Sequence, residues 1–151
     1  MITEDDPLIA DMLEEILVGG GYDVCGIART VDEAVELGKR HKPDLAILDI
    51  RLAEEGLGTD IPAQLKGDGH MGILYVSGRP GGMSLTTAVG HALLTKPFLP
   101  QDLLRAVELV EQIVRTGEAL RPFPPRFYPL NKLSTASDST PLQTEHDSMD
   151  R

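Results

Sequence analysis

Charged residues suited to phosphoryl transfer follow short apolar runs at three separate places in this sequence. Glu4, Asp5 and Asp6 follow residues 1–3, Asp49 follows residues 45–48, and Lys96 follows residues 93–95. Magnesium prefers oxygen ligands and is commonly held by one or two carboxylates together with a phosphate. An aspartate beside such an ion can attack a phosphoryl group and become an aspartyl phosphate. These residue types therefore indicate magnesium-assisted phosphoryl chemistry, provided that the fold brings them together.

The charges of such a site would balance. Glu4, Asp5 and Asp49 carry three negative charges, against two on Mg²⁺ and one on Lys96. Without cations, crowded carboxylates repel and raise one another's pKa. The Lys96 ammonium and the Ser77 hydroxyl suit the oxygens of an incoming phosphoryl group, and Pro97 would restrict the backbone beside Lys96.

Alternating strands and helices predict the fold that could gather these groups. The expected strands cover residues 22–27, 45–49, 73–76 and 91–95, with a very short first strand ahead of Glu4. The expected helices cover residues 8–17, 30–39 (opened by a Thr30/Glu33 capping box), a stretch from Thr59, residues 83–89 and residues 102–115. This order indicates an α/β domain with a doubly wound parallel sheet. Ligands of such sheets bind beyond the carboxyl ends of the strands, where the charged groups lie.

Composition narrows the class of protein. A hydrophobic fraction of 41% is enough for a core, and a net charge of -10 argues against a nucleic-acid partner. The acidic start does not resemble a signal peptide, and no apolar stretch approaches the roughly 20 residues that span a bilayer. A lone Cys25 and the lack of Cys/His zinc spacing favour the reducing cytoplasm.

The chain divides by composition near residue 117. We expect one domain over residues 1–116 and a disordered tail over residues 117–151, because the tail is proline-rich and then polar. Residues 121–129 combine prolines with aromatic residues, so this stretch could instead pack loosely against the domain or serve as a docking peptide.

The motifs together resemble the receiver domain of bacterial two-component response regulators, of the single-domain chemotaxis (CheY-like) type. The resemblance covers about residues 1–116. It depends on the acidic pair Glu4-Asp5, on Asp49, on Ser77-Gly78 and on Lys96-Pro97-Phe98, in this order at successive strand ends. It implies a flavodoxin-like (βα)5 fold with five parallel strands in the order 2-1-3-4-5, here with a truncated first strand.

The resemblance also implies a role for each motif. Asp49 would be the phosphoacceptor; Asp5, Asp49 and the backbone carbonyl of Arg51 would bind Mg²⁺ directly, and Glu4 through water. Ser77 and Lys96 would bind the phosphate. Gly78 and Pro97 would support them. The donor would be a phosphohistidine on a sensor histidine kinase or on a histidine phosphotransfer protein.

Some features depart from the family pattern. The switch position in the fifth strand, usually Tyr or Phe, falls on Leu93, and the region of the fourth helix is short and rich in glycine. No output domain follows, so we expect a stand-alone receiver that acts on a downstream protein target, with a homodimer as one option.

The sequence thus predicts a cytoplasmic phosphorelay signalling protein, whose only expected reactions are its own phosphorylation and dephosphorylation. One alternative is an interaction module with the receiver fold that works without phosphate. Another is a Mg²⁺-dependent phosphatase with an aspartyl-phosphate intermediate. The second is disfavoured, because dehalogenase-type phosphatases place an acidic residue where this chain has Arg51.

Overall fold

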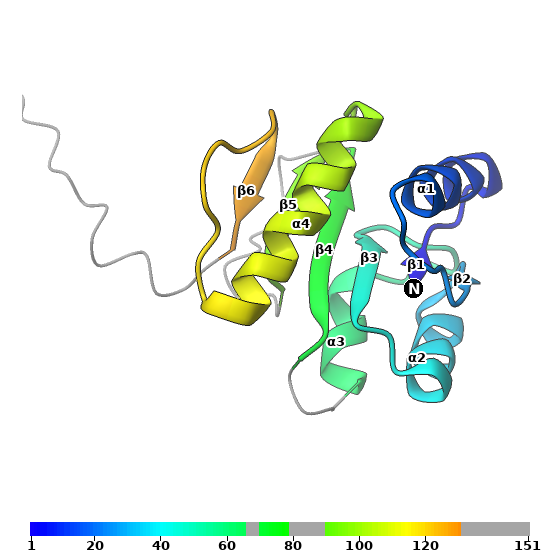
Figure 1. Ribbon diagram of the computed structural model, residues 1–151. Coiled ribbons are helices and arrows are strands. Elements are labelled where there is room, and N and C mark those ends of the chain that lie inside the picture. Colours follow the sequence, from blue (N-terminus) through cyan, green and yellow to red (C-terminus); the bar gives the residue numbers. More distant parts are fainter. Residues whose placement is uncertain (66–69, 79–89, 131–151) are drawn as a thin grey trace, which may run out of the picture.

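The computed structural model describes residues 1–65, 70–78 and 90–130, and in these the chain forms a six-stranded sheet flanked by helices (Figure 1). The strands are β1 (Ile2–Thr3), β2 (Ile27–Ala28), β3 (Leu45–Asp49), β4 (Gly72–Ser77), β5 (Ala92–Thr95) and β6 (Phe127–Pro129). The helices are α1 (Pro7–Gly19), α2 (Val31–His41), α3 (Ile61–Gln64) and α4 (Pro100–Thr116), with a 3-10 turn η1 (Gly58–Asp60). The expected helix over residues 83–89 lies outside the described residues.

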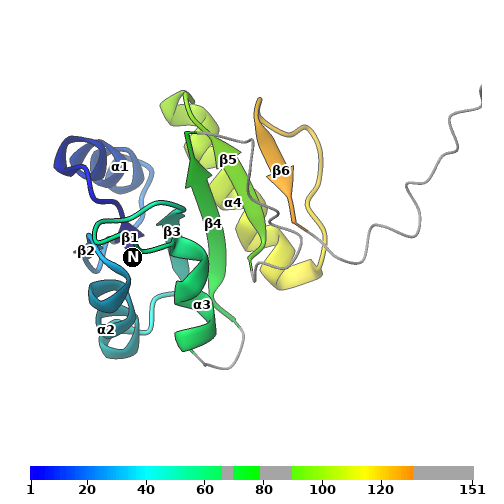
Figure 2. The same ribbon diagram turned by 180° about the vertical axis from the view of Figure 1, so that it is seen from behind.

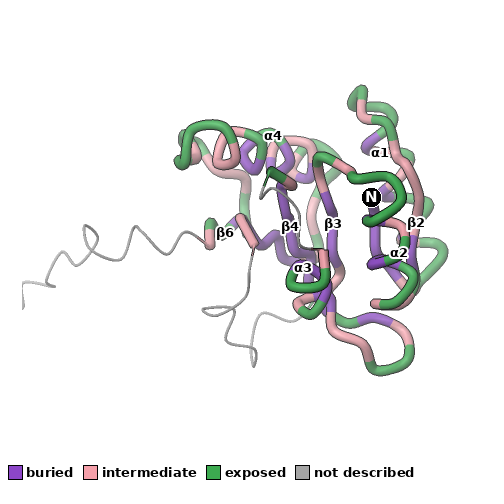
Figure 3. The backbone as a smooth tube through the Cα atoms, turned by 90° about the horizontal axis from the view of Figure 1, so that it is seen from below, coloured by how far each residue is buried: buried purple, intermediate pink, exposed green. Residues whose placement is uncertain are grey.

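The sheet order is β2-β1-β3-β4-β5-β6, and its first five strands are parallel. This confirms the predicted doubly wound α/β fold with the order 2-1-3-4-5, including the very short first strand. Helices cover both faces of the sheet (Figure 3). Leu13 of α1 and Leu103 of α4 pack on one face, and Val35 of α2 and Ile61 of α3 belong to the core on the other.

The central strands agree closely with their prediction. Residues 46–48 and all of β4 are buried, as expected of parallel strands that are covered on both faces. The expected strand over residues 22–27 is wrong in its extent, because β2 covers only Ile27–Ala28. Its partner β1 is two residues long, and a parallel ladder ends where its partner strand ends.

Two helix starts show the local interactions that set them. Thr30 caps α2 through its hydroxyl, which accepts a hydrogen bond from the Glu33 N–H at 3.1 Å. The Glu33 carboxylate accepts from the Arg29 N–H at 2.8 Å, one residue before the position that the predicted capping box requires. Helix α4 begins at Pro100 rather than at Asp102, because proline is favoured in the first turn and the Asp102 carboxylate accepts from the Leu99 N–H.

The expectation of disorder is wrong for residues 117–130. We call residues 118–130 the strap. It returns from the end of α4 and adds β6 antiparallel to β5 at the sheet edge (Figure 2). The Arg105 guanidinium donates hydrogen bonds to the carbonyls of Leu120 and Pro122, and Phe127 enters the core beside the ring of Phe123. Residues 131–151, the rest of the expected tail, lie outside the described residues.

The outer side of β6 offers few hydrogen-bond donors to another strand. Phe127 and Pro129 direct their backbone away from β5, because the ladder bonds alternate along the strand. The Phe127 N–H donates to the carbonyl of Pro124 at 3.3 Å, and proline has no N–H. The strap therefore both extends the sheet and ends it.

We predict that Phe127→Ala lowers the free energy of unfolding by about 3–5 kcal/mol, because it removes a buried aromatic ring from the core. Tyr128→Ala is the matched control. Its side chain is 51% exposed, so its effect should stay within about 0.5 kcal/mol. Urea denaturation followed by circular dichroism measures both. Equal effects of the two variants would mean that the strap does not contribute to the folded core.

Candidate functional site

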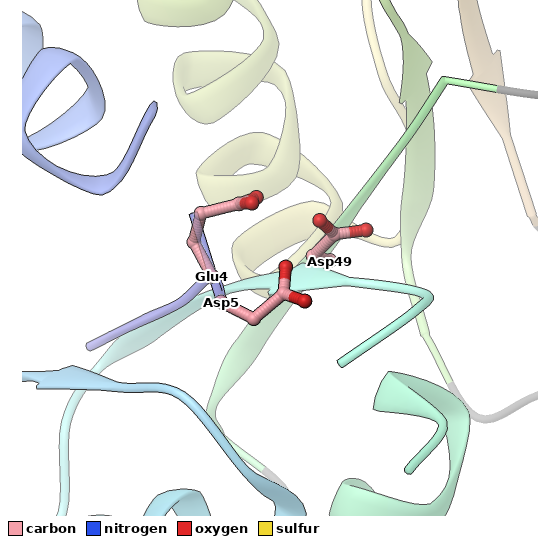
Figure 4. Close-up of side chains that lie close together, drawn as sticks. All are labelled: Glu4, Asp5 and Asp49. Atoms are coloured by element: carbon pink, nitrogen blue, oxygen red, sulfur yellow. The ribbon is translucent and has the colours of Figure 1, made fainter. Parts of the chain in front are cut away.

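The predicted acidic residues meet at the carboxyl edge of the sheet. Glu4 and Asp5 directly follow β1, and Asp49 is the last residue of β3. Because β1 and β3 are parallel neighbours with Thr3 opposite Leu48, the next residues along the two chains, Glu4 and Asp49, are brought side by side. Figure 4 shows the three carboxylates pointing toward a common space, and one oxygen of each lies within 4.8 Å of the others.

Lys96 completes the cluster from the other side. It directly follows β5, and its ammonium lies 3.4 Å from Oε2 of Glu4 and 3.6 Å from Oδ2 of Asp49. The Glu4 side chain is 2% exposed, that of Asp49 12% and that of Lys96 24%. Coulomb interactions between such poorly solvated charges are stronger than those on an open surface.

The electrostatic cost of this arrangement appears at Glu4. Burial, followed by a hydrogen bond to Asp49 and the charge of Asp49, raises the pKa of Glu4 from 4.5 to about 8. The Lys96 ammonium and a hydrogen bond from the Asp6 N–H at 3.2 Å act in the opposite direction but do not cancel the rise. The Glu4 carboxyl therefore binds its proton more tightly than an exposed glutamate does, and another cation in the cluster would oppose this effect.

The donor set fits Mg²⁺. Carboxylate oxygens from Glu4, Asp5 and Asp49 converge, and oxygen donors of this kind are the ligands of hard divalent cations. Burial and the neighbouring Asp49 raise the pKa of Glu4, and a divalent cation bound here would oppose both effects by favouring the ionised carboxylate.

The remaining predicted site residues lie around this cluster. Ser77 ends β4, one residue beyond Val76, the register partner of Asp49, and Gly78 is exposed beyond it. The Lys96 N–H donates to the Ser77 carbonyl at 2.7 Å, which ties the ends of β4 and β5 together. The Arg51 N–H donates to Oδ1 of Asp49 at 3.2 Å. The metal role of the Arg51 carbonyl and the phosphate role of the Ser77 hydroxyl stay predictions.

Two more residues bear on the predicted switch and on the lysine motif. Leu93 is buried in the core cluster that contains Tyr75, its register partner in β4. Tyr75 therefore places an aromatic side chain beside the predicted switch position, but from the neighbouring strand β4. Pro97 is exposed and follows a cis peptide bond to Lys96.

Gly58 is a site residue that sequence reasoning missed. Its N–H donates to the carbonyl of Ile50 at 2.8 Å, which brings its Cα against the backbone of Asp49. A Cβ at this position would overlap the carbonyl oxygen of Asp49. Glycine thus permits the loop after β3 to fold back on the residue that bears the central carboxylate. The sequence shows only a glycine in an expected loop. It does not show the contact of this glycine with the backbone of Asp49.

The fold and the site define a class of protein: the chain belongs to the response regulator receiver domain family, whose model matches residues 1–108. The transcriptional regulatory protein PdtaR of Mycobacterium tuberculosis is 35% identical over 123 residues, which are 80% of this chain and 60% of PdtaR. The phyllosphere-induced regulator PhyR of Methylorubrum extorquens is 32% identical over 79% of this chain and 46% of PhyR. The chemotaxis protein CheY of Thermotoga maritima is 29% identical over 74% of this chain and 96% of CheY.

Solved structures agree with this family assignment. A mutant of the anti-anti-sigma factor PhyR from Bartonella quintana matches with a TM-score of 0.61 and 30% identity, over 78% of this chain and 48% of that one. The receiver domain of a modulated diguanylate cyclase from Desulfovibrio desulfuricans matches with a TM-score of 0.63 and 27% identity, over 78% and 95%. The resemblance stated from the motifs is thus confirmed, and the relatives are signalling proteins. The chain spans 60% or less of PdtaR and PhyR. None of its described helices could cross a bilayer.

We predict that Glu4 gives the metal-free protein a stability that falls as pH rises. The folded state keeps this proton up to about pH 8, whereas the unfolded chain loses it near pH 4.5. The folded state therefore binds more protons between these values, and the free energy of unfolding decreases across them. Glu4→Gln should remove most of this slope, and Glu15→Gln, at an exposed position of α1, should not. Urea denaturation at a series of pH values tests this; equal slopes in all three proteins would contradict it.

We predict that Gly58→Ala destabilises the fold by about 1–3 kcal/mol, because the added methyl group must displace the backbone of Asp49. Gly19→Ala is the matched control, since nothing lies within 4 Å of a Cβ at that position. Thermal unfolding measures both variants. If Gly58→Ala melted like Gly19→Ala, the loop would not pack against Asp49 as described.

Proposed function

We propose that the protein is a receiver that accepts a phosphoryl group on Asp49, with Mg²⁺, from a phosphohistidine donor, and thereby changes its affinity for a protein partner. The single observation that carries the proposal is the convergence of the Glu4, Asp5 and Asp49 carboxylates on one space beside the Lys96 ammonium. The donor would be a histidine kinase or a phosphotransfer protein. A lone, partly buried Cys25 is consistent with a cytoplasmic location.

Each side chain of the site would have its own role in phosphoryl transfer. Glu4, Asp5 and Asp49 would hold Mg²⁺, which when bound supplies positive charge that offsets the phosphoryl oxygens. Oδ1 of Asp49 accepts a hydrogen bond from the Arg51 N–H, which orients the carboxylate. One Asp49 oxygen would bond to phosphorus while the phosphorus–nitrogen bond of the donor breaks, and its electron pair would return to the imidazole nitrogen.

Lys96 would then connect phosphorylation to conformation. In the described state its ammonium pairs with Glu4 and Asp49, so a phosphoryl group on Asp49 offers it a new anionic partner. The backbone bond from Lys96 to Ser77 would transmit that change to the end of β4. Phosphate contacts can favour one of two conformers only by their difference in free energy between the two.

The other two functions make different demands on the site. A module that works without phosphate would not need Asp49 to be reactive, and the buried aliphatic Leu93 at the usual aromatic switch position is the observation that favours it. A phosphatase would need a general acid near Asp49, where the chain has Arg51. Turnover of a small phosphoester would support the phosphatase.

We predict that acetyl phosphate with Mg²⁺ adds one phosphoryl group to the protein, and that Asp49→Asn abolishes the addition, because an amide is not a nucleophile of this kind. Asp11→Asn, at an exposed position of α1, is the matched control and should be labelled normally. Intact-protein mass spectrometry with and without EDTA measures the result. Labelling that survives both Asp49→Asn and EDTA would refute the proposed function.

A further inference from the structure

One residue of the strap forms hydrogen bonds to both chain neighbours of Lys96. The carbonyl of Arg126 accepts from the Thr95 N–H at 3.1 Å. Its guanidinium donates to the carbonyl of Pro97 at 3.3 Å. Arg126 therefore spans the backbone on either side of the lysine, from the outer edge of the sheet.

The inner side of the same segment is held by β4, through the bond from the Lys96 N–H to the Ser77 carbonyl. The three residues 95–97 are thus fixed between β4 and the strap. The Lys96 ammonium stands 3.4 Å and 3.6 Å from the two carboxylates, near the long end of such contacts. A small shift of the backbone would accordingly change which oxygens the ammonium can reach.

The strap is anchored well enough to act as a fixed support. Phe127, the next residue after Arg126, is buried in the core, and the Leu130 N–H donates to the carbonyl of His91 at 2.9 Å. At the other end the Arg105 guanidinium holds the carbonyls of Leu120 and Pro122. Arg126 is exposed, but the backbone that carries it is fixed on both sides.

The residue type at position 126 is informative. The φ angle is 64°, in the left-handed region that glycine adopts without cost and that other residues adopt rarely. Glycine could still provide the carbonyl for Thr95, but it could not provide the guanidinium that reaches Pro97. Arginine at this position costs backbone strain, but its guanidinium forms the hydrogen bond to the Pro97 carbonyl that glycine could not form.

We propose that Arg126 is a positioning residue for Lys96: through its bonds to Thr95 and Pro97, it holds the lysine where the ammonium can meet a phosphoryl group on Asp49. The part that concerns phosphate rests on the proposed function. The part that concerns Lys96 in the unphosphorylated protein does not, so the two can be tested separately.

The first test measures phosphorylation of the full chain by acetyl phosphate at saturating Mg²⁺. Arg126→Gly keeps the backbone bond and removes the guanidinium, and we expect the maximal rate to fall by about 10-fold, since small misplacements of a reacting group cost this much or more. Arg126→Lys should restore most of the rate, because an ammonium can still donate to Pro97. Arg121→Ala, also in the strap but with its guanidinium over the Phe123 ring, should react like the wild type.

A double-mutant cycle separates positioning from general loosening of the fold. With Lys96→Ala in place, Arg126→Gly should cause no further loss of rate, because the group that it positions is gone. If Arg126→Gly slows the reaction equally with and without Lys96, or if it does not slow it at all, the inference is overturned.

The second test needs no phosphate. The resonance of the Lys96 side-chain ammonium in ¹⁵N-labelled protein should shift in Arg126→Gly and stay in place in Arg121→Ala. An unchanged resonance in Arg126→Gly overturns the inference whether or not Asp49 is phosphorylated. If instead the wild type is not labelled at Asp49 but this resonance shifts, the proposed function fails while the positioning of Lys96 stands.

Discussion

The structure depends on a concentration of negative charge that the sheet forces together. Parallel pairing of β1 with β3 places Glu4 and Asp5 beside Asp49, and the burial of Glu4 with the partial burial of Asp5 and Asp49 limits screening by water. Lys96 provides one compensating charge, and burial together with Asp49 still raises the pKa of Glu4 to about 8. A cation bound at such a site would stabilise the ionised form of these carboxylates. The loop at Gly58 contacts the backbone of Asp49, and the bond from the Lys96 N–H to the Ser77 carbonyl ties the ends of β4 and β5 together beside these groups.

Much of this site could be read from the sequence because its residues sit at the ends of apolar runs. Asp49 ends the buried strand β3 and Lys96 directly follows the buried strand β5, and a parallel sheet brings such positions to one edge whatever the intervening chain does. Gly58 could not be recognised in the same way, since its role is a contact between backbones that only the folded loop creates. The sequence pattern overestimates the length of β2 for a related reason. A strand extends only as far as its neighbour, and that neighbour is not adjacent in sequence.

The strap is a segment whose composition predicts disorder although it is folded. Prolines and polar residues predict disorder when a segment has nothing to bury, but Phe123 and Phe127 give this one two rings for the core. Its pairing also needs the free edge of β5, which no local pattern reveals. The family model matches residues 1–108, so the strap lies beyond the residues that the model matches. Its closeness to Lys96 makes it part of the site's surroundings rather than an appendage.

The lack of free hydrogen-bond donors on the outer side of β6 affects how copies of this protein can associate. An open strand edge invites another chain to add its own strand, which leads to dimers by edge pairing or to aggregation. Here the Phe127 N–H is already bonded and Pro129 has none, so a neighbouring chain would find little to pair with along this strand. Self-association by strand pairing at β6 is therefore disfavoured, and a symmetric dimer would have to use another surface of the protein.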